Sequence, residues 1–483
     1  MAKKGELFSS LFSVRQISDK IKNGDISPVD LVEVCLNRIK KLNPILNAFI
    51  TVLDEQQIYK QAETREKEIK QGKYLGPLHG IPFSVKDMFH AKGVPFTAGS
   101  KLFVDYVSQK DSIPVKRMKN VGAVLIGTNN LNEFASGITG KNPFYGDSKN
   151  PWDQHRISGG SSGGSAVAVA TGMAMVSLGT DTGGSVRVPS SLCGVVGLKP
   201  TYDLVSKQGV FPLSPSLDHV GWITKCVWDS AIVLNCLSKK NSLNKIFESG
   251  KKNPIFANHK NKEKEKVVLG IPVNYFNDYL HSDVEHIFNN FVERLPPDKI
   301  RIENIKLNVT EQYYKSWRTV RLAEAAQIHL AWLKSRQCDY SSEMRKMLVD
   351  GTKISAIEYL QAMNITKGIR KEFLSILRNK IDALIVPTTI VPSPKLNEDA
   401  VIVNKDALMD TRESLLRNTI IFNSIGFPAV SLPLGLTKES GLPVGLQIAG
   451  PPYGEDLVLS IAYYFESINE SDFKSIPPPP LLR

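Results

Sequence analysis

The sequence has no apolar run of the length that a membrane-spanning helix needs, about 20 residues. Its first twelve residues, MAKKGELFSSLF, lack the extended apolar stretch of a signal peptide and lead directly into polar, helix-like sequence. We therefore expect neither a membrane anchor nor a secretory leader, and we expect the protein in the cytoplasm.

Cysteine is scarce, with five scattered residues that form no C-x-x-C pair. This pattern provides neither a disulfide framework nor the ligand spacing of a zinc site, and it is typical of reduced thiols inside a cell. The eight histidines include no H-E-x-x-H motif or other ligand cluster. We therefore expect no metal and no other cofactor.

The positive charge of the chain is concentrated in one stretch. Composition is otherwise ordinary, with 42% hydrophobic and 22% charged residues, and it allows a large buried core. A formal net charge of +12 would fit a nucleic-acid-binding protein. Residues 239–266, however, hold nine lysines and three glutamates, which is half of the excess, and they contain few aromatics. This composition favours a solvated loop over an RNA-binding surface.

The pattern along the chain alternates between helices and short apolar strands. Residues 26–42 begin with a helix-start signature, Ser27, Pro28 and Asp30, and continue with apolar residues at helical spacing. A polar helix is predicted at about 55–71, a helix of small residues at 165–175, and mostly helical structure over 283–380. Strands are predicted within the ranges 80–89, 123–128, 382–389, 429–435 and 444–450.

This alternation predicts an α/β fold, a large β-sheet covered by helices on both faces. Strand-like segments lie on both sides of the lysine-rich stretch and can join the same sheet. We therefore interpret residues 1–483 as one domain with an exposed insertion at about 239–266.

Two stretches rich in glycine and serine could hold a reactive hydroxyl. The first, SGGSSGGSA at 158–166, matches G-x-S-x-G around Ser161, but a nucleophile elbow must follow a buried strand. The preceding residues, NPWDQHRI, are polar and turn-like, so the elbow interpretation is weak. No Gly-Lys-Ser/Thr follows the glycines, which excludes a phosphate-binding loop.

The second stretch, GTDTGGSVR at 179–187, is better suited to nucleophilic chemistry. The apolar segment MAMVSLG can deliver it from a buried strand, and Thr182, Gly183 and Gly184 put backbone N–H groups just before Ser185. Converging N–H groups stabilise the oxyanion of a tetrahedral intermediate. We expect Asp181 and Arg187 to pair and brace the loop. A serine also needs a base, and no histidine is close in sequence.

The full motif resembles the amidase signature family. The match rests on SGGSSGGSAVAVATGMAMVSLGTDTGGSVRVPSSLCGVVGLKPTY at 158–202, with GPLHGIPFSVKDMF upstream and GLPVGLQIAGPPYGEDLVL downstream. It extends from about residue 20 to residue 466. The resemblance implies a large mixed sheet, a Ser–Ser–Lys triad without histidine, and an acyl-enzyme. Matched position by position, it implies Ser185 as nucleophile, Ser161 as relay serine, Lys86 as base, and Thr182, Gly183 and Gly184 lining the oxyanion hole.

A lysine acts as a base only if its surroundings lower its pKa toward neutrality. The apolar residues GIPFSV before Lys86 fit a buried strand. Asp87 would stabilise the charged lysine, but successive strand residues point to opposite faces, so we expect Asp87 to face away.

The resemblance leaves two enzymatic branches open. We favour a free-standing amidase that cleaves a small-molecule carboxamide; its oligomeric state is open, a homodimer included. The alternative is the glutaminase subunit of a glutamyl-tRNA(Gln)/aspartyl-tRNA(Asn) amidotransferase, which works with partner subunits. That branch carries an acidic residue in the segment that corresponds to 414–428, where this chain has no carboxylate, although Arg345 could match the arginine that holds the glutamine carboxylate. A catalytically silent scaffold or RNA-binding subunit that has kept the fold is a third interpretation; it predicts loss of one or more triad residues, and all three are present.

Overall fold

The computed structural model describes residues 13–238, 266–404, 407–468 and 478–482. The expected lysine-rich insertion at 239–266 therefore lies outside the described residues except for Lys266. Within the described ranges, no helix combines the length and the apolar character that crossing a bilayer requires.

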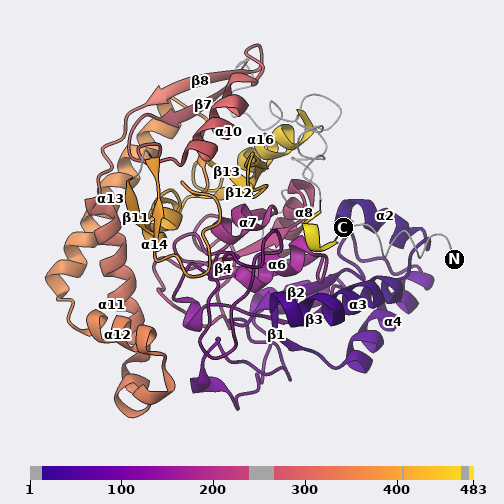
Figure 1. Ribbon diagram of the computed structural model, residues 1–483. Helices are drawn as coiled ribbons and strands as arrows, with labels where there is room; N and C mark the ends of the chain where they lie inside the picture. Colours follow the sequence, from indigo (N-terminus) through magenta and orange to yellow (C-terminus); the bar gives the residue numbers. More distant parts are fainter. Residues whose placement is uncertain (1–12, 239–265, 405–406, 469–477, 483) are drawn as a thin grey trace.

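Eleven strands form one mixed sheet (Figure 1), in the order β1-β3-β2-β4-β6-β5-β12-β13-β9-β7-β8. Strands β2 and β3, β2 and β4, β7 and β8, and β7 and β9 pair in parallel, and the other neighbours are antiparallel. The strands are β1 Phe49–Val52, β2 Pro82–Lys86, β3 Val124–Asn129, β4 Val176–Asp181, β5 Val196–Lys199, β6 His219–Thr224, β7 Val267–Pro272, β8 Ile300–Ile305, β9 Ala383–Pro387, β12 Ala429–Leu436 and β13 Pro443–Ala449; β10 Ala400–Ile402 and β11 Leu408–Asp410 form a separate two-stranded sheet. Strands from both sides of the lysine-rich stretch thus join the same sheet.

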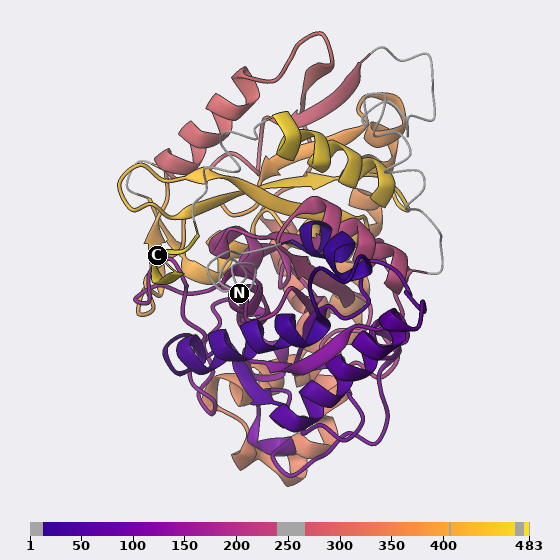
Figure 2. The same ribbon diagram turned by 90° about the vertical axis from the view of Figure 1, so that its right-hand side faces the viewer.

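Helices cover both faces of this sheet, as the alternating pattern predicts (Figures 1 and 2). The α-helices of the described residues are α2 Val14–Lys22, α3 Pro28–Leu46, α4 Glu55–Lys70, α5 Ile113–Asn120, α6 Gly163–Ala170, α7 Arg187–Cys193, α8 Val227–Leu237, α10 Ser282–Glu293, α11 Gln312–Ser335, α12 Ser342–Thr352, α13 Ala356–Asn379, α14 Thr411–Leu416, α15 Ile420–Ser424 and α16 Glu455–Ile468. Successive residues of a strand point to opposite faces of the sheet, and each face packs against its own hydrophobic core. In β9, Ile385 belongs to the core that includes α8 and α16, whereas Leu384 and Val386 belong to the core that includes α11 and α13.

The first long helix follows the predicted start signals closely. Ser27 caps α3 in a capping box with Asp30, and Pro28 occupies the first turn. The apolar residues at helical spacing are all buried, namely Leu31, Val34, Cys35, Ile39 and Leu42. The helix packs this stripe against the core and ends at Asn47 in the left-handed conformation.

Two local predictions differ from the structure. The small-residue helix expected at 165–175 is α6, which already ends at Ala170, and its last turn is followed by Gly172 at a φ of +67°. The range 283–380 is mostly helical, as predicted, with α10, α11, α12 and α13 joined by loops, but it also contains β8, an unpredicted strand at the edge of the sheet. An edge strand is half-exposed, so β8 carries charged residues where a central strand would be apolar.

Candidate active site

The two glycine–serine stretches meet at the carboxyl ends of parallel strands. Lys86 is the last residue of β2, and the loop 182–186 follows the neighbouring strand β4. Ser161 and Ser162 lie just before α6, and the backbone N–H of Ser162 donates to the carbonyl of Ser185 at 3.1 Å. The carboxyl ends of parallel strands are where α/β proteins bind ligands. The fold therefore gathers the predicted lysine and both serine loops at one edge.

Lys86 is completely buried and bonded to hydroxyl groups. Its Nζ lies 2.8 Å from Ser161 Oγ and 2.8 Å from Thr180 Oγ1. Burial lowers the pKa of Lys86 to about 7, although the carboxyl groups of Asp181 and Asp218 act in the opposite direction. Near neutral pH the amine therefore exists in both protonation states and can accept a proton.

Asp87 faces away from Lys86, as the strand alternation predicts. Its Oδ2 accepts hydrogen bonds from the backbone N–H of Thr97 at 3.0 Å and from the Thr97 hydroxyl. Burial raises the pKa of Asp87 to about 7, and Asp87 is not among the groups that shift the pKa of Lys86.

The Ser185 loop is a strand–turn–helix connection, from β4 to α7, whereas Ser161 follows irregular chain. Gly184 has a φ of +136°, and a Cβ there would collide with the Thr419 hydroxyl. A Cβ on Gly183 would collide with the indole of Trp317, which donates to the carbonyl of Thr182 at 3.1 Å. Glycine is therefore required at both positions for the turn to exist.

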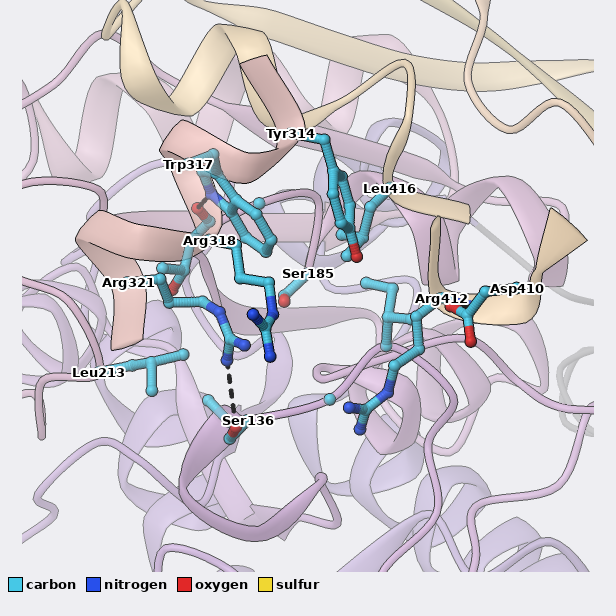
Figure 3. A pocket seen from close by; sticks show the side chains of 15 residues that line it. Ser136, Ser185, Leu213, Tyr314, Trp317, Arg318, Arg321, Asp410, Arg412 and Leu416 are labelled. Carbon is cyan, nitrogen blue, oxygen red and sulfur yellow. Dashed lines mark hydrogen bonds between the residues drawn. The ribbon is translucent and has the colours of Figure 1, made fainter. Parts of the chain in front are cut away.

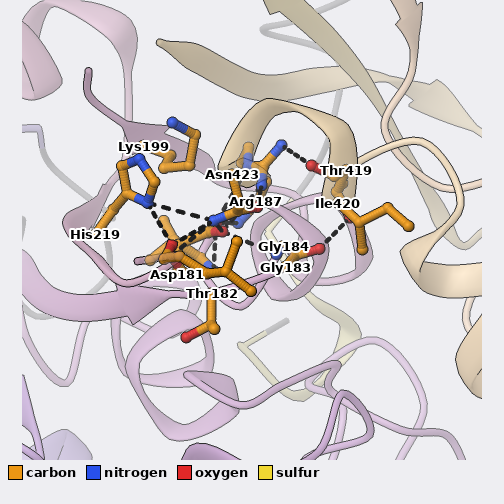
Figure 4. Close-up of polar contacts among 12 residues, drawn as sticks. Asp181, Thr182, Gly183, Gly184, Arg187, Lys199, His219, Thr419, Ile420 and Asn423 are labelled. Carbon is orange, nitrogen blue, oxygen red and sulfur yellow. Dashed lines mark hydrogen bonds and ion pairs between the residues drawn. The ribbon is translucent and has the colours of Figure 1, made fainter. Parts of the chain in front are cut away.

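Asp181 and Arg187 pair beneath the loop, which confirms the predicted brace (Figure 4). Arg187 Nη2 lies 2.9 Å from Asp181 Oδ1, and both side chains are fully buried. Burial would raise the pKa of Asp181, but the charge and hydrogen bond of Arg187 outweigh burial and hold that pKa well below its ordinary value. The same carboxylate accepts the backbone N–H of Gly184 at 2.8 Å and of Val186 at 3.1 Å. The pair thus fixes the course of the turn.

Ser185 lies at the bottom of a pocket of about 240 Å³ (Figure 3). Its walls come from four parts of the chain in addition to the Ser185 loop: residues 135–138, Leu213, one face of α11, and residues of the range 410–416, from the end of β11 through α14. On α11 the lining residues recur at helical spacing, namely Tyr314, Trp317, Arg318 and Arg321. Ser185 is 5% exposed and lines this pocket, through which a substrate can reach it.

Comparison with known proteins decides the family. The model of the amidase family matches residues 30–459. The chain belongs to the amidase family. A subunit of the glutamyl-tRNA(Gln) amidotransferase of Sulfurihydrogenibium sp. is 30% identical, with 95% of this chain and 97% of that protein covered.

Solved structures agree with this family assignment. A crystal structure of an amidase is 34% identical, has a TM-score of 0.85, and matches over 95% of this chain and 100% of that chain. The peptide amidase from Stenotrophomonas maltophilia is 25% identical, with a TM-score of 0.79 over 97% of this chain and 98% of that chain. The chain is thus an amide-hydrolysing enzyme by family, and its fold is that of these amidases.

No histidine of the described residues lines the Ser185 pocket. His155 is exposed. His219 is buried and does not line the Ser185 pocket; its Nδ1 lies 2.7 Å from the carbonyl of Leu217. Burial holds the pKa of His219 well below its ordinary value, so the ring stays neutral.

Several residues of the site were not predicted from the sequence. Thr180 bonds Lys86, and Asn423 donates to both Asp181 Oδ1 and the Asp181 carbonyl at 2.8 Å. Arg345, which could match the arginine that holds the glutamine carboxylate in the glutaminase branch, is exposed on α12 and does not line the pocket, whereas Arg321 does. The side-chain type and spacing along the chain give no signal for Thr180 or Asn423, because their partners are distant in sequence.

Proposed function

We propose that this amidase hydrolyses a small carboxamide through an acyl-enzyme on Ser185, with Ser161 as relay and Lys86 as base. The observation that carries the proposal is the buried contact between Lys86 Nζ and Ser161 Oγ at 2.8 Å, with the pKa of Lys86 lowered to about 7. A neutral amine has one lone pair, which accepts the Ser161 proton, while an N–H of Lys86 donates to Thr180.

In the first half of the reaction, the Ser185 oxygen attacks the amide carbon and its proton passes to Ser161, whose own proton passes to Lys86. When the C–N bond breaks, Ser161 delivers a proton to the leaving nitrogen and recovers one from Lys86, and ammonia departs. In the second half, water attacks the ester by the same route, and the acid is released with Ser185 restored.

The oxyanion of the tetrahedral intermediate is assigned to the turn formed by Thr182, Gly183 and Gly184. The N–H of Gly184 already donates to Asp181 Oδ1, so we assign it a shaping role. No described residue accepts a hydrogen bond from the N–H groups of Thr182 and Gly183, which leaves them to the oxyanion. Each such donor is worth about 3–4 kcal/mol in the transition state.

Ammonia release by the purified chain tests this function. The panel contains simple amides such as butyramide together with L-glutamine. Hydrolysis is expected to fall at least about 1000-fold in Ser185→Ala and in Lys86→Met. Ser191→Ala is the matched control, since Ser191 is a buried α7 serine whose hydroxyl has no partner among the described residues. Activity that survives in Ser185→Ala would refute the proposal.

A glutaminase subunit of a tRNA amidotransferase is the second candidate, because relatives with that name align over nearly the whole chain. We favour the free-standing enzyme: Leu416 lines the pocket in the stretch 414–428, which offers no carboxylate for the ammonium of glutamine. Activity confined to L-glutamine, or seen only after partner subunits are added, would instead support the glutaminase.

A further inference from the structure

The pocket above Ser185 is strongly cationic. Three of its lining residues are arginines, Arg318, Arg321 and Arg412, and one is a carboxylate, Asp410. Arg318 and Arg321 extend side by side from α11, and Arg412 enters from the opposite wall (Figure 3). Asp410 caps α14, since its Oδ1 accepts the backbone N–H groups of Arg412 and Glu413. A neutral ligand would bring no negative charge to balance the excess of arginines among these lining residues.

Arg321 is half-buried and, within the described part of the chain, lacks the carboxylate partner that each of the two fully buried arginines has. Arg187 pairs with Asp181, and Arg417 donates to both oxygens of Glu311, at 2.8 and 3.0 Å. Arg321 has no carboxylate partner among the described residues; its Nη1 donates to Ser136 Oγ at 3.2 Å and contacts Met347 Sδ.

The rest of the Arg321 guanidinium is also short of partners. Its Nε is buried without a hydrogen-bond acceptor among the described residues. Desolvation is the main cause that lowers the pKa of Arg321 to about 10, and the neighbouring Arg412 adds to it. Arg412 itself is paired with Glu343. A desolvated guanidinium is costly unless an anion accepts its hydrogen bonds.

We propose that the substrate supplies this anion: the pocket selects carboxamides whose acyl part ends in a carboxylate, which Arg321 binds and Arg318 flanks. The inference rests on the proposed function and narrows its substrate class to monoamides of small dicarboxylic acids. A guanidinium presents paired N–H donors that match a carboxylate. The pocket volume of about 240 Å³ admits an acyl chain of only a few carbons.

An amino group on the substrate would oppose this binding. Its ammonium would lie among three guanidinium groups, and the single lining carboxylate, Asp410, is already engaged as a helix cap. Like charges in a desolvated site repel each other. Glutaramate, which is glutamine without its amino group, is therefore expected to be the better substrate of that pair.

The first experiment compares kcat/KM for succinamate and for 4-oxopentanamide, in which a methyl ketone replaces the carboxylate. We expect succinamate to be preferred at least about tenfold, and Arg321→Met to reduce this preference by about 10- to 100-fold. Arg321→Lys keeps the positive charge and is expected to retain part of the preference for succinamate. The matched control is Arg345→Met, an exposed α12 arginine outside the pocket, which leaves the preference unchanged. Equal use of both amides would overturn the inference, as would better use of L-glutamine than of glutaramate.

A binding measurement separates this inference from the proposed function. Calorimetry on Ser185→Ala measures the affinity for succinamate without turnover, and Ser185→Ala/Arg321→Met is expected to bind it about 10- to 100-fold more weakly. Equal affinity in the two variants would overturn the role of Arg321. If Ser185→Ala instead still hydrolyses amides, the proposed mechanism fails, while the calorimetric result still decides whether the pocket selects a carboxylate.

Discussion

Replacing Lys86 by methionine is expected to abolish activity and to stabilise the fold, more at low pH than at high pH. Burial lowers the pKa of Lys86 from its ordinary 10.5 to about 7. This difference corresponds to a free-energy cost of about 5 kcal/mol for the charged form of Lys86 in the folded protein. The lysine is thus kept at the expense of stability, as active-site groups often are.

The sign of the pH dependence follows from proton binding. Between about pH 7 and pH 10.5, the unfolded chain binds a proton at Lys86 that the folded chain does not bind. The destabilisation of the folded protein by Lys86 therefore grows as the pH falls through this window and is fully present below pH 7. The gain in stability for Lys86→Met is expected to be about 3 kcal/mol larger at pH 6 than at pH 9. The two lost hydrogen bonds, to Ser161 and Thr180, lower the gain at both pH values and largely cancel in the difference.

Urea denaturation at the two pH values measures this difference for the wild type and Lys86→Met. Lys346→Met serves as control, because Lys346 is exposed on α12 and outside the pocket. Its effect on stability should be the same at both pH values. A gain for Lys86→Met that is equal at pH 6 and pH 9, or larger at pH 9, would refute the argument that Lys86 has a lowered pKa.

Further variants test the surroundings of Lys86 and of the Ser185 turn. With a neutral amide as substrate, kcat/KM should rise with pH to half its maximum near pH 7, since only the neutral form of Lys86 accepts a proton. Thr180→Val should lower kcat/KM about tenfold and move this midpoint to lower pH, because the charged amine loses an acceptor; Thr180→Ser should keep both values. Arg187→Met leaves Asp181 buried without its counter-ion, and urea unfolding should detect a loss of about 3–5 kcal/mol. Gly184→Ala should lower kcat/KM strongly, because its Cβ meets Thr419; Gly76→Ala, at a φ of +120° with no atom nearby, should affect stability alone. An unchanged midpoint in Thr180→Val, or full activity in Gly184→Ala, would contradict the site geometry.

The parts of the site that lie in continuous sequence could be predicted from it. The turn from Asp181 to Arg187 carries its own signals: an apolar strand before it, two glycines, and two opposite charges that can pair. The burial of Lys86 was predictable because an apolar strand leads to it, whereas its role as base came only from the resemblance to the amidase signature family. In each case the physical determinants lie within a few residues, and the structure has the same strand, turn and ion pair.

The parts that depend on tertiary packing could not be predicted. The spacing of Trp317, Arg318 and Arg321 indicates one helix face, but not that this face lies over Ser185. Thr180 and Asn423 acquire their contacts only when β4 meets β2 and when α15 packs against the loop. Pairing across such distances in sequence leaves no local pattern, and the same holds for β8, whose edge position makes it polar.

The central claim is that Ser185 is the nucleophile and that Lys86 activates it through Ser161. The most direct test maps the residue that a fluorophosphonate probe modifies in the purified chain and follows its rate. The account predicts an adduct on Ser185, none in Ser185→Ala, and much slower labelling in Lys86→Met. An adduct on Ser161, or a labelling rate that Lys86→Met leaves unchanged, would contradict it.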